Sequence, residues 1–283
     1  MNPIHELYTI SMLAVAALLF AWRIGFFQRP AGTGELPKPH GWEVTLAALL
    51  YFGVQLAFVP VLVVIFLGLW QGEEDAYALI LSSDVQNWIS FAAAASALPA
   101  LIGFAWYRDL RLWQPTTQKP QRFFIEWGKG VLTWLVAFPL VSTLGLTSKL
   151  VMRMFYTGPE PEQVAIQHLK NAMESPGAFF FAVLAITLFI PITEELLFRG
   201  FFQNWLKRHF SSVWAITVSS LVFALVHLSV SQAWMNVVLF ISLLGLSCFL
   251  GYLYEREKSL WAPIGLHMVF NAFTVAMLAL EAF

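Results

Sequence analysis

Apolar stretches long enough to cross a membrane follow one another along the whole chain, separated by short polar segments. A helix needs about 20 apolar residues to span a bilayer. Stretches near or above that length lie at residues 7–27, 43–70, 86–107, 125–148, 178–203, 212–230, 234–254 and 259–281. The pattern predicts an all-α polytopic membrane protein of about eight transmembrane helices, with residues 1–283 forming a single membrane domain.

Composition narrows the location and the partners of the protein. Hydrophobic residues make up 59% of the chain and charged residues 12%, whereas an ordinary soluble domain has roughly 25% charged residues. We therefore expect a multi-pass protein of the cell membrane, in contact with the lipid bilayer. The net charge of -1 leaves no basic excess for binding nucleic acid. The single cysteine, Cys248, excludes a disulfide framework and a cysteine-based zinc site within one chain.

Basic residues are distributed unequally between the two sets of alternating loops. One set contains Arg23, Arg29, Lys38, Arg108, Arg111, Lys119, Arg122, Lys129, Lys207, Arg208, Arg256 and Lys258. The other set contains only Lys149, Arg153 and Lys170. Because loops rich in Lys and Arg stay in the cytoplasm, we expect the first set to be cytoplasmic and both ends of the chain to lie outside.

The polar segment at residues 160–175 interrupts the apolar pattern. Val164, Leu169, Ala172 and Met173 would lie roughly on one face of a helix there. Two interpretations stay open for this segment. It is a helix at the membrane interface, which is the more common arrangement, or it is a lid over an active site.

Ionisable side chains inside the apolar stretches gather late in the chain. At the centre of a membrane helix each one costs about 2.5–3.5 kcal/mol, so those that remain need partners and are candidates for function. They are Glu194, Glu195, Arg199, His227 and His267. The neutral polar residue Asn271 lies one helical turn after His267.

Helix geometry gives the two glutamates different partners. Glu195 and Arg199 are four residues apart with the acid first, which favours an ion pair on one face of a helix. Glu194 points about 100° away from Glu195. If the chain reverses near residues 209–212, His227 lies at the same depth as Glu194 on the neighbouring helix. We therefore expect Glu194 and His227 to meet.

These residue types suit hydrolysis of a peptide bond. A carboxylate and an imidazole can take a proton from water and deliver it to a leaving amine. His267 and Asn271 share a helix face, and their N–H groups could stabilise an oxyanion. Alternatively, Glu194, His227 and His267 could hold Zn²⁺ with one position open for water. Spacing alone leaves both alternatives open.

The chain lacks the residues that other classes of intramembrane protease require. The three aspartates Asp75, Asp84 and Asp109 lie in or beside loops, so a paired aspartyl site is excluded. The chain has neither His-Glu-x-x-His nor Gly-x-Ser-Gly, which removes the helical zinc-protease motif and the usual context of an intramembrane serine nucleophile.

At these residues the sequence resembles the CPBP family, the CAAX-protease and bacteriocin-processing membrane proteins also known as type II CAAX prenyl endopeptidase-like or Abi proteins. Glu194-Glu195-x-x-x-Arg199 matches the first motif of the family, Phe223-x-x-x-His227 the second and His267-x-x-x-Asn271 the third. The resemblance covers residues 178–275, which we take as the catalytic core.

The resemblance implies an eight-helix fold around a polar cavity that opens towards the cytoplasm, and an intramembrane endopeptidase activity on a peptide or membrane-protein substrate. It assigns Glu194 and His227 to water activation and His267 and Asn271 to oxyanion stabilisation. Glu195 and Arg199 become supporting residues. Whether the substrate is prenylated stays open.

Dependence on a metal is a separate expectation. We expect that catalysis does not strictly need zinc, because His267 and Asn271 suit an oxyanion clamp. A second reason is that no orienting carboxylate is evident for His267 once Glu195 is paired with Arg199. If zinc is required, its ligands would be Glu194, His227 and His267.

Two rival functions use the same residues differently. A non-catalytic scaffold or immunity protein would keep the fold without the activity, but the complete set of motif residues argues against it. A transporter would use the polar residues as a relay. We would then expect broken helices at corresponding positions of two repeats, and none is evident.

Overall fold

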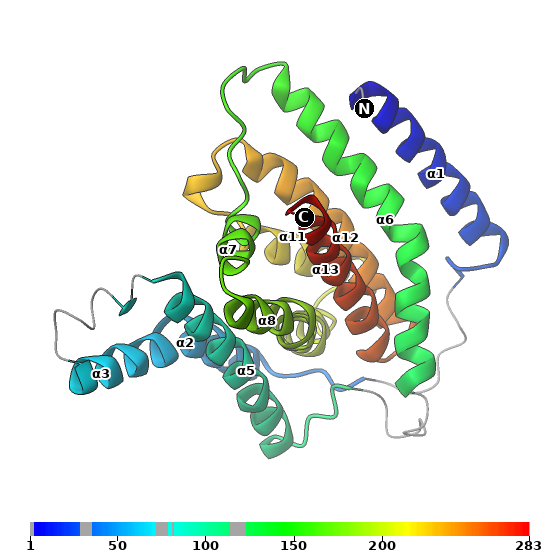
Figure 1. The fold of residues 1–283 in the computed structure, drawn as a ribbon. Helices are drawn as coiled ribbons and strands as arrows, with labels where there is room; N and C mark the ends of the chain where they lie inside the picture. Colours follow the sequence, from blue (N-terminus) through cyan, green and yellow to red (C-terminus); the bar gives the residue numbers. More distant parts are fainter. Residues whose placement is uncertain (1–2, 29–35, 72–78, 81, 114–122, 283) are drawn as a thin grey trace.

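The computed structural model describes residues 3–28, 36–71, 79–80, 82–113 and 123–282, and these residues are helical with short connections (Figure 1). Seven of the described helices are long and apolar enough to cross a membrane. They lie at Pro3–Arg23, Gly41–Trp70, Asp84–Tyr107, Phe123–Arg153, Pro176–Leu206, Met235–Glu257 and Trp261–Glu281. The predicted all-α polytopic architecture is confirmed.

Several of these long helices consist of shorter helical segments. The first half of the chain contains α1 (Pro3–Arg23), α2 (Gly41–Gly53), η1 (Val54–Phe58), α3 (Val59–Gln71), α5 (Ser83–Tyr107) and α6 (Phe123–Arg153). The second half contains α7 (Val164–Ala172), α8 (Pro176–Leu184), η3 (Ala185–Phe189), α9 (Ile190–Glu195), η4 (Leu196–Gln203), α10 (Asn204–Leu206), α11 (Ser212–Leu225), η5 (Val230–Gln232), α12 (Met235–Glu257) and α13 (Trp261–Ala282).

The stretch expected to span the membrane at residues 212–230 is shorter than predicted. Helix α11 has 14 residues and ends at Leu225. Beyond it the chain turns, and the turn is held by Asn236, whose side chain accepts from the Ser229 amide at 3.1 Å and donates to the Ser229 carbonyl at 2.7 Å. The apolar Val230 is 98% exposed. The sequence therefore overestimates the span by counting apolar residues that belong to a turn.

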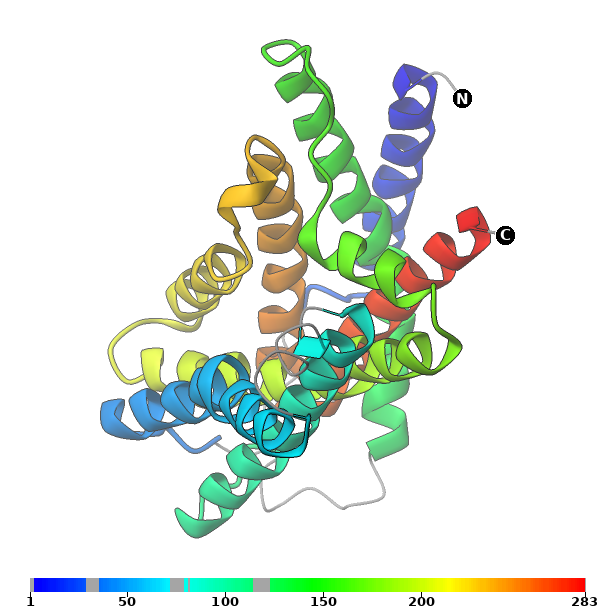
Figure 2. The ribbon, with the colours of Figure 1, turned by 60° about the vertical axis from the view of Figure 1, so that its left-hand side comes forward.

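The basic loops meet at one end of the molecule. Lys207 pairs with Glu255 at 2.7 Å and Lys129 with Glu257 at 2.6 Å, and Arg208 donates to the Lys38 carbonyl at 2.8 Å. We call this the basic end. The connections from α6 to α7 and from η5 to α12 lie at the opposite end, at the top of Figure 2.

Two π-helical segments interrupt the α-helix that carries both glutamates. The segments η3 and η4 are π-helical, an irregularity often found at functional sites. In and beside η4, neighbouring side chains satisfy backbone carbonyls: Ser219 Oγ donates to Phe198 at 3.1 Å and Asn204 Nδ2 to Gly200 at 3.0 Å. The irregular backbone is thus fixed inside the apolar surroundings.

Close packing of α6 on α13 fixes the helix that carries His267. A Cβ atom added to Gly130 would lie 1.9 Å from the Ala262 carbonyl oxygen and 2.9 Å from the Leu266 nitrogen. Small residues allow such close approach of membrane helices. The two backbones can therefore touch only because residue 130 has no side chain.

The variant Gly130→Ala should lower the thermal stability of the purified protein, because α6 and α13 must move apart. Gly128→Ala on the same helix is the matched control, because a Cβ there meets no heavy atom within 4 Å. Removing a helix glycine favours the fold by about 0.5–1 kcal/mol, so the control should be neutral or slightly stabilising. Equal melting temperatures for the two variants would contradict this account of the packing.

Candidate active site

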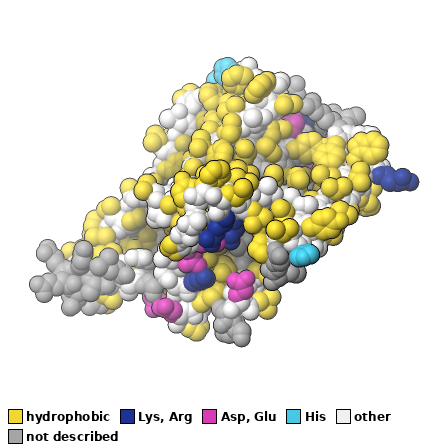
Figure 3. All heavy atoms as spheres, turned by 90° about the horizontal axis from the view of Figure 1, so that it is seen from above, with side chains coloured by type: hydrophobic (Ala, Val, Ile, Leu, Met, Phe, Trp, Pro, Cys, Tyr) yellow, Lys and Arg dark blue, Asp and Glu magenta, His cyan; other side chains and the backbone are white. Residues whose placement is uncertain are grey.

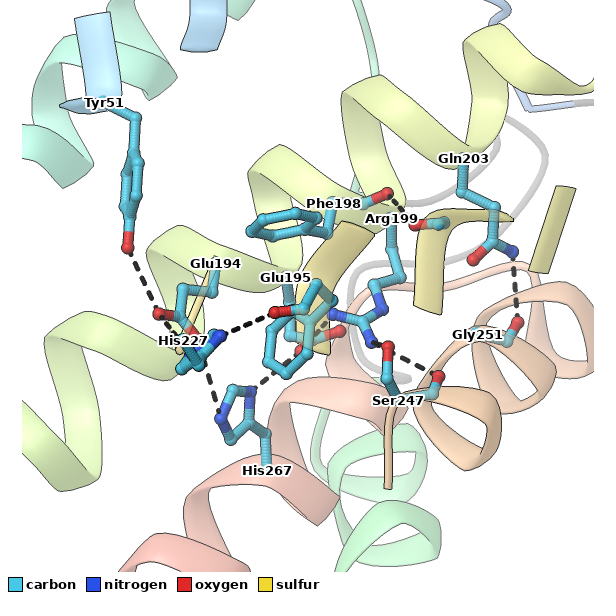
Figure 4. Close-up of polar contacts among 12 residues, drawn as sticks. Tyr51, Glu194, Glu195, Phe198, Arg199, Gln203, His227, Ser247, Gly251 and His267 are labelled. Carbon is cyan, nitrogen blue, oxygen red and sulfur yellow. Dashed lines mark hydrogen bonds and ion pairs between the residues drawn. The ribbon is translucent and has the colours of Figure 1, made fainter. Parts of the chain in front are cut away.

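Three side chains converge on the carboxylate of Glu194: Tyr51 of α2, His227 in the turn after α11, and His267 of α13 (Figure 4). Its Oε1 lies 3.6 Å from His227 Nε2 and accepts a hydrogen bond of 3.2 Å from the Tyr51 hydroxyl. Its Oε2 lies 3.8 Å from His267 Nε2. Glu194 is buried, yet Oε2 accepts no hydrogen bond from the described residues. The matched depth of Glu194 and His227 therefore brings them together as expected.

His227 is oriented by the backbone of the helix that precedes it. Its Nδ1 lies 2.6 Å from the Phe223 carbonyl oxygen, so Nδ1 carries a hydrogen and donates. Nε2 is then directed at Glu194. The ring also packs against the Phe223 ring, with centroids 4.6 Å apart. The side chain remains 29% exposed, so it can exchange protons with water.

Glu195 has two partners where the sequence predicted one. Arg199 Nη1 donates to its Oε1 at 3.0 Å, which confirms the expected ion pair. The same oxygen lies 2.8 Å from His267 Nδ1. His267 therefore does have an orienting carboxylate. The expectation that pairing with Arg199 would leave His267 without one is wrong.

Arg199 is fully buried, and both of its terminal nitrogens have partners. Besides Glu195, its Nη2 donates to the Ser247 hydroxyl at 2.7 Å and to the Ser247 carbonyl at 3.3 Å. Its guanidinium carbon lies 4.7 Å from the centre of the Phe223 ring, within the range of a cation–π contact. The supporting position predicted for Arg199 agrees with these contacts.

Asn271 lies one helical turn beyond His267, and one of its amide hydrogens already has an acceptor. Its Nδ2 donates to the Ile186 carbonyl at 2.8 Å, in the π-helical segment η3. One hydrogen of the amide remains for another acceptor. Asn271 lines the same cavity as His267.

A cavity of about 410 Å³ gives access to these groups. Glu194, His227, His267 and Asn271 form part of its wall, together with Val164 and Ile166 of α7 and many apolar side chains. The amide of Val164 donates to Gln232 Oε1 at 3.3 Å, which ties α7 to the turn after His227. Helix α7 is therefore part of the cavity wall, and this position is compatible with both interpretations of the segment.

The proposed zinc ligands do not form a metal site as they are placed. Among the residues that the structure describes, no group of three or more His, Cys, Asp and Glu side chains is arranged to hold a metal ion. Glu194 lies at ion-pair distance from each imidazole instead.

Sequence reasoning missed two polar partners of the site. Tyr51 comes from α2, far from the three motifs, and a single tyrosine in an apolar stretch gives no signal of a catalytic contact. Ser247 lies in the middle of α12. Ser247 carries a weak signal, because a polar residue at the centre of an apolar stretch needs a partner.

Comparison with known proteins points to the same part of the chain. The family model described as type II CAAX prenyl endopeptidase Rce1-like matches residues 176–273. This range contains every site residue predicted from the sequence. No solved structure matches the chain significantly.

Two curated bacterial proteins show the extent of the similarity. The membrane-embedded CAAX protease MroQ of Staphylococcus aureus (strain USA300) is 27% identical over 248 residues, which cover 83% of this chain and 88% of MroQ. The YpbD protein of Bacillus subtilis (strain 168) is 30% identical over 99 residues, which cover 35% of this chain and 47% of YpbD. Together with the seven apolar helices, these matches support a multi-pass protein of the cell membrane.

The similarity to MroQ extends well beyond the matched domain, and the described site residues from Glu194 to Asn271 lie within that domain. At the level of the family, these findings support membrane proteolysis. Residues 176–273 match the model of the Rce1-like type II CAAX prenyl endopeptidase family.

Proposed function

We propose that the protein is an intramembrane endopeptidase in which Glu194 and His227 activate a water molecule. The observation that carries the proposal is the pairing of Glu194 Oε1 with His227 Nε2 at 3.6 Å in the wall of the cavity. Catalytic contacts are often longer in the absence of substrate and shorten when it binds. The distance between Glu194 and His227 is therefore compatible with joint binding of a water molecule.

In the proposed reaction the water oxygen attacks the carbonyl carbon of the scissile bond. Glu194 and His227 take the proton that the water loses, and the same pair then delivers a proton to the leaving amine as the C–N bond breaks. Tyr51 donates to Glu194 Oε1 and so holds the carboxylate in place.

Two further groups face the position where negative charge develops. His267, with a hydrogen on Nε2, and the remaining amide hydrogen of Asn271 would donate to the oxyanion. Glu195 holds His267 through Nδ1 at 2.8 Å, and Arg199 holds Glu195. These two residues are positioning residues in the proposal.

The direct test is a comparison of membrane peptides in cells that carry the wild type or Glu194→Gln. We expect intact substrate to accumulate in the variant and its fragments to disappear. Identical peptide profiles, with equal amounts of folded protein, would favour a non-catalytic scaffold or immunity protein instead.

We also propose that catalysis does not strictly need a transition metal. The pairing of Glu194 with His227 can move a proton without a Lewis acid, and His267 with Asn271 suits an oxyanion clamp. Purified protein should therefore stay active after exhaustive chelation, with bound metal measured in parallel. Loss of activity that stoichiometric zinc restores would overturn this expectation and make Glu194, His227 and His267 ligands.

A further inference from the structure

The cavity and the basic end lie on opposite sides of the catalytic residues. From Glu194 and His267, the cavity wall continues along η3 and along the parts of α12 and α13 that lie away from the basic end, up to α7. A second pocket of about 480 Å³ begins where the first one ends, and both are lined by Gln163, Ile166 and Leu278. The second pocket reaches Lys149 and Lys170, which belong to the loops poor in basic residues.

The side of the site that faces the basic end is closed by buried side chains. Arg199, Gln203, Asn204 and Tyr254 are at most 1% exposed. They are linked to their surroundings by hydrogen bonds, such as Asn204 Nδ2 to the Tyr254 hydroxyl at 2.6 Å and Gln203 Nε2 to the Gly251 carbonyl at 3.1 Å. A separate apolar pocket of about 510 Å³ lies on this side, between Gly41, Trp205 and Val226, and its lining does not include the four catalytic residues.

Two expectations from the sequence therefore conflict. The basic loops place the basic end in the cytoplasm, whereas the family resemblance implies a cavity that opens towards the cytoplasm. Since the cavity extends away from the basic end, only one of the two can hold. The excess of basic residues is large, with twelve in one set of loops and three in the other, and it is a property of this chain itself.

We infer that the site is reached from the outer face of the membrane, so that its substrates are peptide segments exposed on that face rather than cytoplasmic C-termini. The inference rests on the proposed function and specifies the class of substrate. Apart from the catalytic groups, the cavity wall is mostly apolar, with side chains such as Ile190, Leu243 and Phe270. It fits a segment with apolar residues around the scissile bond.

The charges at the mouth of the second pocket neutralise one another. Glu160 binds both Lys149 at 2.5 Å and Arg153 at 2.7 Å, and Lys170 binds Glu162 at 2.5 Å. Burial raises the pKa of Glu160, but hydrogen bonds and attraction from Lys149 and Arg153 outweigh it and keep the pKa below its usual value. Figure 3, which views this face, shows basic and acidic side chains side by side among apolar ones. The mouth thus has no strong charge that would select a charged peptide.

Cysteine accessibility tests the inference without measuring activity. In a Cys248→Ala background, three separate serines are replaced: Ser242→Cys inside the cavity, Ser231→Cys beside its mouth and Ser211→Cys at the basic end. Intact cells are treated with a small charged methanethiosulfonate reagent that does not cross membranes. Thiols that remain free are then detected by a mass-shifting maleimide after denaturation.

We expect Ser242→Cys and Ser231→Cys to react in intact cells, and Ser211→Cys to react only after the cells are opened. The reverse pattern would overturn the orientation. A Ser242→Cys thiol that reacts only in opened cells, or in neither condition, would show that the cavity does not open outwards. Folded amounts are compared by size-exclusion chromatography. If Ser242→Cys misfolds, Thr274→Cys, which also lies in the lining of the cavity, replaces it.

The outcome is independent of the proposed function. If the labelling pattern holds but Glu194→Gln leaves proteolysis unchanged, the proposed function fails and the outward cavity stands. If Glu194→Gln abolishes proteolysis while the labelling is reversed, the protease assignment stands and the substrate class is wrong.

Discussion

Replacing Glu194 with glutamine should lower the rate of peptide hydrolysis by about 10²–10⁴-fold, the usual contribution of a general acid or base. Glutamine has nearly the same shape and can still accept the hydrogen bond that Tyr51 donates at 3.2 Å. It cannot take a proton from water. The variant should therefore fold normally and bind substrate while losing the chemical step. The measurement is kcat on a purified preparation with any membrane peptide that the wild type cleaves.

Companion variants separate this role from a structural one. His227→Ala should cause a loss of similar size, because His227 Nε2 is the partner of Glu194 Oε1. Tyr51→Phe removes one hydrogen bond, worth about 0.5–1.5 kcal/mol, and should cost roughly tenfold at most. Glu174→Gln changes an exposed carboxylate outside the cavity wall and is the matched control. A folded Glu194→Gln protein with more than about a tenth of wild-type activity would remove Glu194 from the catalytic role.

Hydropathy predicted most of the fold because membrane helices must be long and continuously apolar. Hydropathy overestimated the length of α11 because it counts every apolar residue as part of a helix. Leu228 and Val230 extend the apolar run, but they belong to a turn whose polar atoms are satisfied by Asn236. A count of apolar residues does not register a side chain that bonds to the backbone seven residues away.

The candidate site was predictable where depth alone decides contact, as it does for Glu194 and His227. Depth does not reveal how many partners one carboxylate serves. From the sequence, Glu195 is predicted to pair with Arg199 and not with His267. In the structure, its Oε1 binds both Arg199 and His267. Tyr51 was missed because helix α2 is distant in sequence, and helix packing, which hydropathy does not predict, brings it to Glu194.

Arg199→Ala should mainly destabilise the protein. It removes the charge that balances Glu195 at a position where both side chains are at most 1% exposed. Breaking a buried ion pair by deleting one partner costs about 3–5 kcal/mol, since the remaining charge is left uncompensated. The bonds to Ser247 and the contact with Phe223 are lost as well. We expect a lower melting temperature in detergent and less folded protein in the membrane.

Two further variants show whether the uncompensated charge is the cause. Glu195→Gln should lower the melting temperature less than Arg199→Ala does, because Arg199 keeps Ser247 and Phe223 as partners. The double variant Arg199→Met with Glu195→Gln should be more stable than Arg199→Ala, because a buried pair replaced by neutral groups often costs little. Because Glu195 also holds His267 at 2.8 Å, the double variant should recover stability without recovering full activity. If Arg199→Ala instead melts at the wild-type temperature and is inactive, Arg199 takes part in the reaction itself.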